Sequence, residues 1–203
     1  MKNRTIIIYR YSILIIVLFC HSCIYLRMSH LTNEELAWVE VYREGDSCFF
    51  KSNLGDYDII VINEITIHNR INPYNPKLWN SGYDYTANAC IDFDFITRNF
   101  SDNYFFIKKE IDEDILVFSS RLDTRASLYI TPIVKTFTID SKSFDDCILF
   151  DDRNSYLIHS KQNPVKSYIW SKSKGLIQYT LEDGETFQLT KVKPKAKERF
   201  IFD

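Results

Sequence analysis

The sequence predicts a mainly β domain: an antiparallel, twisted sheet arranged as a sandwich or a half-open barrel, with one short N-terminal helix at about residues 33–43. The strongest observation is an alternation between residues 83 and 95, where every odd position is apolar or aromatic and most even positions are polar. This period of two is typical of a strand with one buried and one solvated face. Shorter β-branched and aromatic runs, separated by turns at which all five glycines fall, favour the same class.

The helix is predicted by the segment "LTNEELAWVEVYREG", residues 31–45. Thr32 can cap its first turn while Glu35 reaches back to the cap, and Leu31 and Leu36 occupy the positions of a hydrophobic staple. Its apolar residues recur at helical spacing, so we expect it to pack on the sheet at the start of the domain.

Roughly nine or ten antiparallel strands are expected from the remaining pattern. A proline-containing loop at residues 70–82 separates the first two of these strands from the long alternating one. The last three are joined by a tight turn at Gly175 and a hairpin turn at Asp183-Gly184. The strand-like segments from which these strands are expected to form lie at 47–53, 57–68, 83–95, 103–109, 115–121, 126–131, 133–139, 147–150 and 166–192.

The N-terminus has the layout of a secretory signal. Lys2, Arg4 and Arg10 precede an apolar stretch at residues 13–20, and the first acidic residue is Glu34. The alternative is an uncleaved membrane anchor, since a span needs about 20 apolar residues and residues 5–25 suffice in length. Arg10 interrupts that stretch, and a buried arginine is costly, so we favour the cleaved signal.

The end of the apolar stretch, residues 18–23 ("LFCHSC"), resembles the lipobox of bacterial lipoproteins. Ser22 would then precede the cut and Cys23 would receive the lipid, with His21 at a position where a small residue is usual. This divides the chain into a signal peptide (1–22), a lipidated tether (23–30) and a single β-rich domain (31–203). A redox role for the Cys20/Cys23 pair would require a βαβ context, which is missing here. A zinc site would require a second pair of ligands, which the sequence does not offer.

Two further segments, "LTNEELAWVEVYREGD" and "YIWSKSKGLIQYTLEDGETFQL", resemble patterns in small envelope lipoproteins of Bacteroidota of unknown function. The resemblance, which with the signal covers about a third of the chain, implies a helix after the anchor and a C-terminal Gly-Leu-Ile-x-Tyr hairpin. It contributes no catalytic residues. No acidic export tag follows Cys23, so the resemblance implies an outer-membrane protein that faces the periplasm, with the cell surface as the alternative.

The charge of the mature chain bears on its partners. Removal of residues 1–22, which carry three basic and no acidic residues, leaves 181 residues and changes the formal net charge from −2 to −5. That balance argues against a nucleic-acid partner, which usually requires a basic field. The basic exception is Lys191–Arg199, where every second residue is cationic, which predicts a solvated edge or a contact with anionic lipid headgroups or an acidic partner.

Three cysteines besides Cys23 remain in the mature chain: Cys48, Cys90 and Cys147. Each lies in an apolar or strand-like run, where a free cysteine behaves as a small buried hydrophobe. An oxidising envelope would also permit one disulfide among them. We expect buried thiols, with one disulfide as the alternative.

Several polar groups match parts of known sites, and for each we favour a structural role. Asp92 and Asp94 share one side of the long strand, where two carboxylates could act as acid and base or hold calcium. The acidic turns at 112–115 and 151–155 lack the spacing of a calcium-binding loop. Residues 171–174 match S-x-x-K without its partner motifs. The mature histidines form no ligand pair: His30, His68 and His159. We therefore predict no catalytic, cofactor-binding or metal residue.

The predicted function is that of a non-enzymatic outer-membrane lipoprotein that presents a β-rich domain for binding or envelope assembly. One alternative is a carrier of a lipid or other hydrophobic ligand inside the half-barrel. It is suggested by clustered aromatic residues and requires a dry cavity of a few hundred Å³. A less favoured alternative is an envelope hydrolase that uses Asp92 or Asp94. The aromatic residues are Trp79, Tyr83, Tyr85, Phe93 and Phe95.

Overall fold

A computed structural model describes residues 27–70, 84–98, 100–111, 115–123, 125–130, 132–157 and 162–195. The predicted signal peptide, Cys23, Trp79, Tyr83, His159 and most of the acidic turn at 112–115 lie outside the described residues. The first part of the domain contains β1 (Arg27–Met28), α2 (Asn33–Leu36), β2 (Ser47–Ser52), β3 (Tyr57–His68), β4 (Asp84–Tyr85), β5 (Asn88–Phe95), β6 (Phe100–Lys109) and β7 (Leu116–Leu122). The second part contains β8 (Arg125–Ile130), β9 (Lys135–Ile139), β10 (Lys142–Phe150), β11 (Ser155–Leu157), β12 (Val165–Ser171), β13 (Gly175–Leu181) and β14 (Thr186–Lys193).

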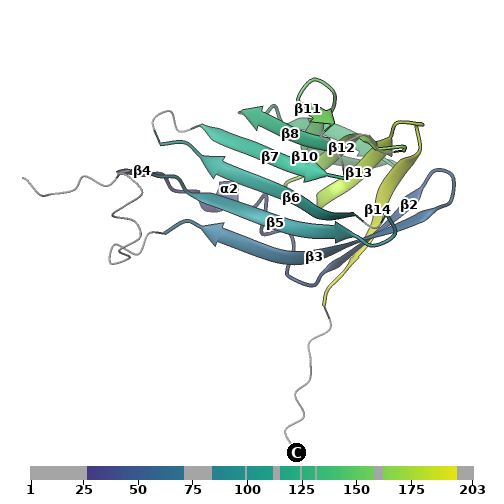
Figure 1. The fold of residues 1–203 in the computed structure, drawn as a ribbon, viewed down its shortest axis with the longest axis horizontal. Coiled ribbons are helices and arrows are strands. Elements are labelled where there is room, and N and C mark those ends of the chain that lie inside the picture. The colour runs from purple at the N-terminus through teal and green to yellow at the C-terminus, as the bar shows by residue number, and fades with distance from the viewer. Residues whose placement is uncertain are drawn as a thin grey trace, which may run out of the picture.

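Twelve strands form one antiparallel sheet in the order β11-β8-β7-β6-β5-β3-β2-β14-β13-β12-β10-β9. The sheet curls into a half-barrel, so that β5 to β8 lie in front of β10, β12 and β13 in Figure 1. The predicted fold class is confirmed, and of its two arrangements the half-barrel is the one observed. Register irregularities in β3, β5, β10, β12 and β14 accompany the curl, because bulges bend a strand and increase its twist.

The long alternating segment forms two strands. Its alternation is confirmed in β5, where odd positions are buried and even positions are half-buried. The break before β5 comes from Ser29, whose N–H donates to the Tyr85 carbonyl at 3.1 Å and whose Oγ accepts from the Ala87 N–H at 2.8 Å. β4 consequently pairs with β1, in parallel, and only β5 joins the large sheet. Residues 27–29 of the predicted tether therefore lie against the domain.

The helix begins where the sequence predicts it and ends earlier. The capping box is present, because Glu35 N–H donates to Thr32 Oγ1 at 3.1 Å and Glu35 Oε2 accepts from Thr32 N–H at 2.7 Å. α2 stops at Leu36 instead of continuing to about residue 43, which corrects the prediction. In a longer helix the Trp38 carbonyl would accept from the residue-42 N–H. It instead accepts from Trp170 Nε1 at 3.3 Å, so tertiary contacts replace the helical ones.

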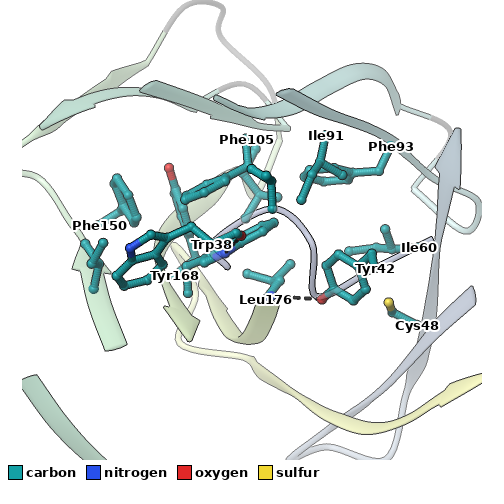
Figure 2. Packing of buried hydrophobic residues seen from close by; sticks show 14 of the residues in the cluster. Trp38, Tyr42, Cys48, Ile60, Ile91, Phe93, Phe105, Phe150, Tyr168 and Leu176 are labelled. Atoms are coloured by element: carbon teal, nitrogen blue, oxygen red, sulfur yellow. Dashed lines mark hydrogen bonds between the residues drawn. The ribbon is translucent and has the colours of Figure 1, made fainter. Parts of the chain in front are cut away.

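The core lies on the concave face, and Figure 2 shows Trp38 and Tyr42, from the segment after α2, among the core side chains. Trp38 and Tyr42 point into it and are 5 % and 4 % exposed. Trp38 packs edge-on against Phe118, with 5.2 Å between ring centroids, and Tyr42 packs edge-on against Trp170 at 6.1 Å. The segment after α2 thus packs into the interior of the half-barrel.

Candidate functional site

The interior of the half-barrel is filled by aromatic side chains. Phe150 stacks on Tyr168 with 4.7 Å between centroids, and Tyr179 stacks on Phe187 at 4.8 Å. The cavity beside Trp170 has a volume of only ≈ 10 Å³, roughly that of one water molecule. Its lining consists of Tyr42, Cys48, Phe50, Ile60, Ile62, Phe93, Trp170 and Leu176. This part of the interior therefore has no space for an acyl chain.

Phe93 and Phe95, which the sequence places near a possible ligand, belong to this packed core at 3 % and 2 % exposure. Tyr85 is half-buried in β4. Phe93 and Phe95 therefore stabilise the interior.

Buried polar side chains connect the two walls of the half-barrel. Tyr168 Oη on β12 donates to Ser127 Oγ on β8 at 2.8 Å and also hydrogen bonds with Ser120 on β7. Arg125, 3 % exposed, donates from Nε to the Val165 carbonyl at 2.7 Å. These groups are satisfied within the fold, so they are structural.

Asp92 and Asp94 lie on the outer side of β5, along a groove of ≈ 440 Å³. Burial raises the pKa of Asp92, and a hydrogen bond from Cys90 opposes that shift. The carboxylate of Glu64, which is the register partner of Asp92 on the neighbouring strand β3, raises the pKa further. Among the described residues, no three His, Cys, Asp or Glu side chains converge as a metal site. The groove is completed by Asn63, Phe93, Asp102, Asn103, Tyr104 and Arg121.

The S-x-x-K match forms the turn between β12 and β13. Ser171 Oγ donates to Asp146 Oδ1 at 2.7 Å and accepts from the Lys174 N–H at 3.1 Å. Asp146 Oδ2 accepts from the Ser173 N–H at 2.7 Å. The serine hydroxyl therefore closes a turn. Ser171 is 0 % exposed, so a substrate could not reach its hydroxyl as it would have to reach a nucleophile.

The remaining polar groups considered in the sequence form no site among the described residues. The acidic turn at 151–155 is closed locally: Asp151 accepts from the Arg153 backbone N–H at 3.0 Å and from its guanidinium. His30 Nδ1 lies 3.3 Å from the Asn69 carbonyl oxygen. His68 is exposed at the end of β3.

Cys48, Cys90 and Cys147 are all free thiols. Cys48 and Cys147 are buried, as predicted, and Cys90 is half-buried. The alternative of a disulfide among them is not observed.

A second hollow lies on the convex face, between the β9–β10 hairpin and the β13–β14 pair. We call it the outer groove. It has a volume of ≈ 370 Å³, within the range of about 300–1,000 Å³ typical of small-molecule sites. Its lining consists of Ile139, Asp140, Lys142, Phe144, Lys174, Ile177, Leu189, Thr190, Lys191 and Val192.

The floor of the outer groove belongs to a hydrophobic cluster separate from the main core. Cys147, Ile169 and Ile177 are buried in this cluster. The half-buried residues packed on them are Phe137, Ile139, Phe144, Leu149 and Leu189. The strands here bury apolar residues on both faces, whereas the outer face of β5 carries carboxylates.

The alternating cations of residues 191–199 include Lys191, but their spacing does not predict the groove beside it. An available signal was the loss of alternation in "YIW" (168–170), "GLI" (175–177) and "CIL" (147–149). Consecutive apolar residues in a strand indicate burial on both faces. The register irregularity between Ile169 and Trp170 turns their partner strand so that Ile177 faces outward.

Comparisons of the chain with protein-family models, with curated proteins and with solved structures found no match. Within the residues that the structure describes, no helix has the length and apolar character needed to span a bilayer.

Proposed function

We propose that this chain is a non-enzymatic lipoprotein of the bacterial outer membrane, anchored through Cys23 and facing the periplasm. Its half-barrel serves as a binding domain, and binding takes place on the outer surface. The signal-like N-terminus and the lipobox-like "LFCHSC" support the anchor.

The observation that carries the binding role is the contrast between the two faces of the sheet. Among the residues that the structure describes, the cavity beside Trp170 on the concave face has a volume of only ≈ 10 Å³, whereas the convex face has a groove of ≈ 370 Å³ with an apolar floor. A ligand inside the half-barrel would have to displace aromatic side chains from the core. We therefore do not propose the internal carrier, and we place binding on the convex face.

The geometry offers no support for hydrolysis. Asp92 accepts a hydrogen bond from the Cys90 thiol and has the like-charged Glu64 as a neighbour. These contacts do not form the pair of nucleophile and general base that hydrolysis by covalent catalysis requires. We propose no catalytic, cofactor or metal role for either aspartate.

The anchor is tested by mass spectrometry of the full chain purified from membranes. We expect a mature N-terminus at Cys23 carrying two or three acyl chains. Cys23→Ser should abolish lipidation, and the matched variant Cys20→Ser should leave it intact. Recovery of a lipid-free chain that retains residues 1–22 would overturn the anchor while leaving the binding role to be judged separately.

A further inference from the structure

The outer groove combines an apolar floor with cationic side chains. Its lining includes Lys142, Lys174 and Lys191, and its only acidic residue is Asp140. The Asp140 carboxylate lies 2.8 Å from the side-chain amide of Gln188, which donates to it when that amide is oriented to satisfy both groups. The lining therefore carries a net positive charge in a mature chain that is acidic overall.

The groove lysines lack the carboxylate partners that three other lysines of the domain have. Lys108, Lys109 and Lys172 each form an ion pair, at 2.9, 2.9 and 3.1 Å, with Glu110, Glu35 and Glu34 respectively. Within the described part of the chain, Lys142, Lys174 and Lys191 have no carboxylate within 4.0 Å. Lys191 Nζ instead lies 4.6 Å from the centre of the Phe49 ring. Lys142 and Lys174 are thus available to an anion.

The floor beneath these cations is suited to a hydrocarbon chain. Phe144 and Leu189 are half-buried and, with the buried Ile177 between them in the lining, give the groove an apolar floor. Val192 remains 39 % exposed at the side of the groove. Burial of such surface is favourable in proportion to its apolar area.

We propose that the outer groove binds a single-chain amphiphile with an anionic head, of the class of long-chain carboxylates. Its chain lies on Phe144, Ile177 and Leu189, and its head meets Lys142 and Lys174. The charge complementarity selects an anionic head. The groove has walls on two sides, from the β9–β10 hairpin and the β13–β14 pair, and this selects one free chain over the surface of a bilayer. The inference rests on the proposed binding function and is independent of the anchor.

The test uses the full chain in nanodiscs of phosphatidylcholine and a laurate probe that carries a diazirine in its chain. Saturable photolabelling of peptides that contain residues 139–144 and 189–192 is expected. Unlabelled laurate should compete, and dodecanol, which has the same chain and no charge, should compete at least about ten-fold less well. No saturable labelling, or labelling elsewhere on the domain, would overturn the proposal.

Two matched pairs of substitutions separate the contributions. Lys142→Glu with Lys174→Glu should weaken labelling by about ten-fold or more, whereas Lys51→Glu with Lys166→Glu, at exposed positions outside the groove lining, should leave it unchanged. Val192→Gln should weaken it, and Leu54→Gln on a distant exposed turn should not. Equal losses in both lysine variants would show only a general charge effect and contradict the site.

The source of the amphiphile is tested with a photoreactive phosphatidylglycerol built into the nanodisc. Its chain should label the groove peptides far less than free laurate does. Labelling by the bilayer lipid equal to that by laurate would show a membrane-docking face and overturn the assignment to a single free chain. Because the anchor is measured by the mass of the N-terminus, its failure is distinguishable from failure at the groove.

Discussion

The indole of Trp170 lies flat on the phenyl ring of Phe105, with 3.9 Å between their centroids and 2° between their planes. Trp170 belongs to β12 and Phe105 to β6, which are separated by five strands in the sheet order. The stack therefore joins the two walls of the half-barrel directly. Both side chains are buried, at 1 % and 0 % exposure.

Truncation of this stack should strongly destabilise the domain. Phe105→Ala is expected to lower the free energy of unfolding by about 3–5 kcal/mol, because it removes a buried ring and leaves a cavity between the walls. Leu54→Ala, at a residue that is 73 % exposed, should change it by less than about 0.5 kcal/mol. Urea unfolding of the full chain in a mild nonionic detergent measures both. Similar effects of the two substitutions would contradict the closed core.

The turn at Gly175 is expected to accept no side chain. Its φ of +73° is left-handed, and a Cβ there would lie 2.2 Å from Tyr42 Oη. That hydroxyl accepts from the Leu176 N–H at 2.9 Å and donates to the Lys174 carbonyl at 3.2 Å. Gly175→Ala should therefore destabilise the domain in two ways. The backbone is strained, and the new methyl group displaces Tyr42 so that its hydroxyl loses these hydrogen bonds.

Gly184 is the matched control, because its φ is +93° and a Cβ at this position would have no atom within 4 Å. Gly184→Ala should cost only the left-handed strain, about 1–2 kcal/mol. Gly175→Ala should exceed it by about 2 kcal/mol or more, measured by the same urea titration. An equal loss of unfolding free energy in the two variants would contradict the predicted displacement of Tyr42.

Asp58 should make stability depend on pH in the sense opposite to most carboxylates. Burial raises its pKa above 3.8, although hydrogen bonds from Tyr179 Oη at 2.5 Å and the Ile59 N–H at 2.7 Å oppose the shift. The folded state then keeps a proton that the unfolded chain releases. This contribution is fully present below the unfolded pKa and is lost as pH rises through the folded pKa.

The measurement compares the full chain with Asp58→Asn, whose amide does not titrate. Between about pH 3 and pH 6 the unfolding free energy of the natural chain should fall relative to the variant, by about 1.4 kcal/mol for each unit of pKa elevation. Glu35, Asp146 and Asp151 have lowered pKa values and act in the opposite direction, but they are common to both proteins and cancel in the difference. A difference that rises with pH would contradict the buried proton.

The thiols should react slowly in the folded chain. Burial raises the pKa of Cys48, Cys90 and Cys147 from 9.0 to about 12, which lowers the thiolate population near neutral pH by about a thousand-fold. Iodoacetamide should modify the half-buried Cys90 before Cys48 and Cys147, and urea should accelerate all three. Peptide mass spectrometry gives the order, and a chain lighter by two hydrogens would reveal a disulfide instead.

Local sequence signals predicted much of the fold. Alternation identified the strand at β5, the capping box identified the start of α2, and the turn residues identified the hairpins at Gly175 and Gly184. These features depend on residues close together in the chain, so their physical causes can be read from spacing alone. The short strand β11 was not predicted, since its three residues carry too little pattern.

The features that failed prediction depend on distant residues. The helix ends at Leu36, and in the turns that follow it the Trp38 carbonyl accepts from the Trp170 indole, across 132 positions of sequence. The long strand breaks because Ser29 binds Ala87 and Tyr85. In each case a tertiary hydrogen bond outweighs the local propensity.

The sequence by itself determined that this chain is a mainly antiparallel β protein, because period-two burial and turn chemistry are local properties. Only the tertiary structure decided that the sheet curls into a half-barrel, because bulges bend its strands and Phe105 packs on Trp170 between its two walls. It also decided where a groove lies, since Phe144, Ile177 and Leu189 meet only when the β9–β10 hairpin lies beside β13 and β14. The spacing of these three residues along the chain does not predict that they lie together.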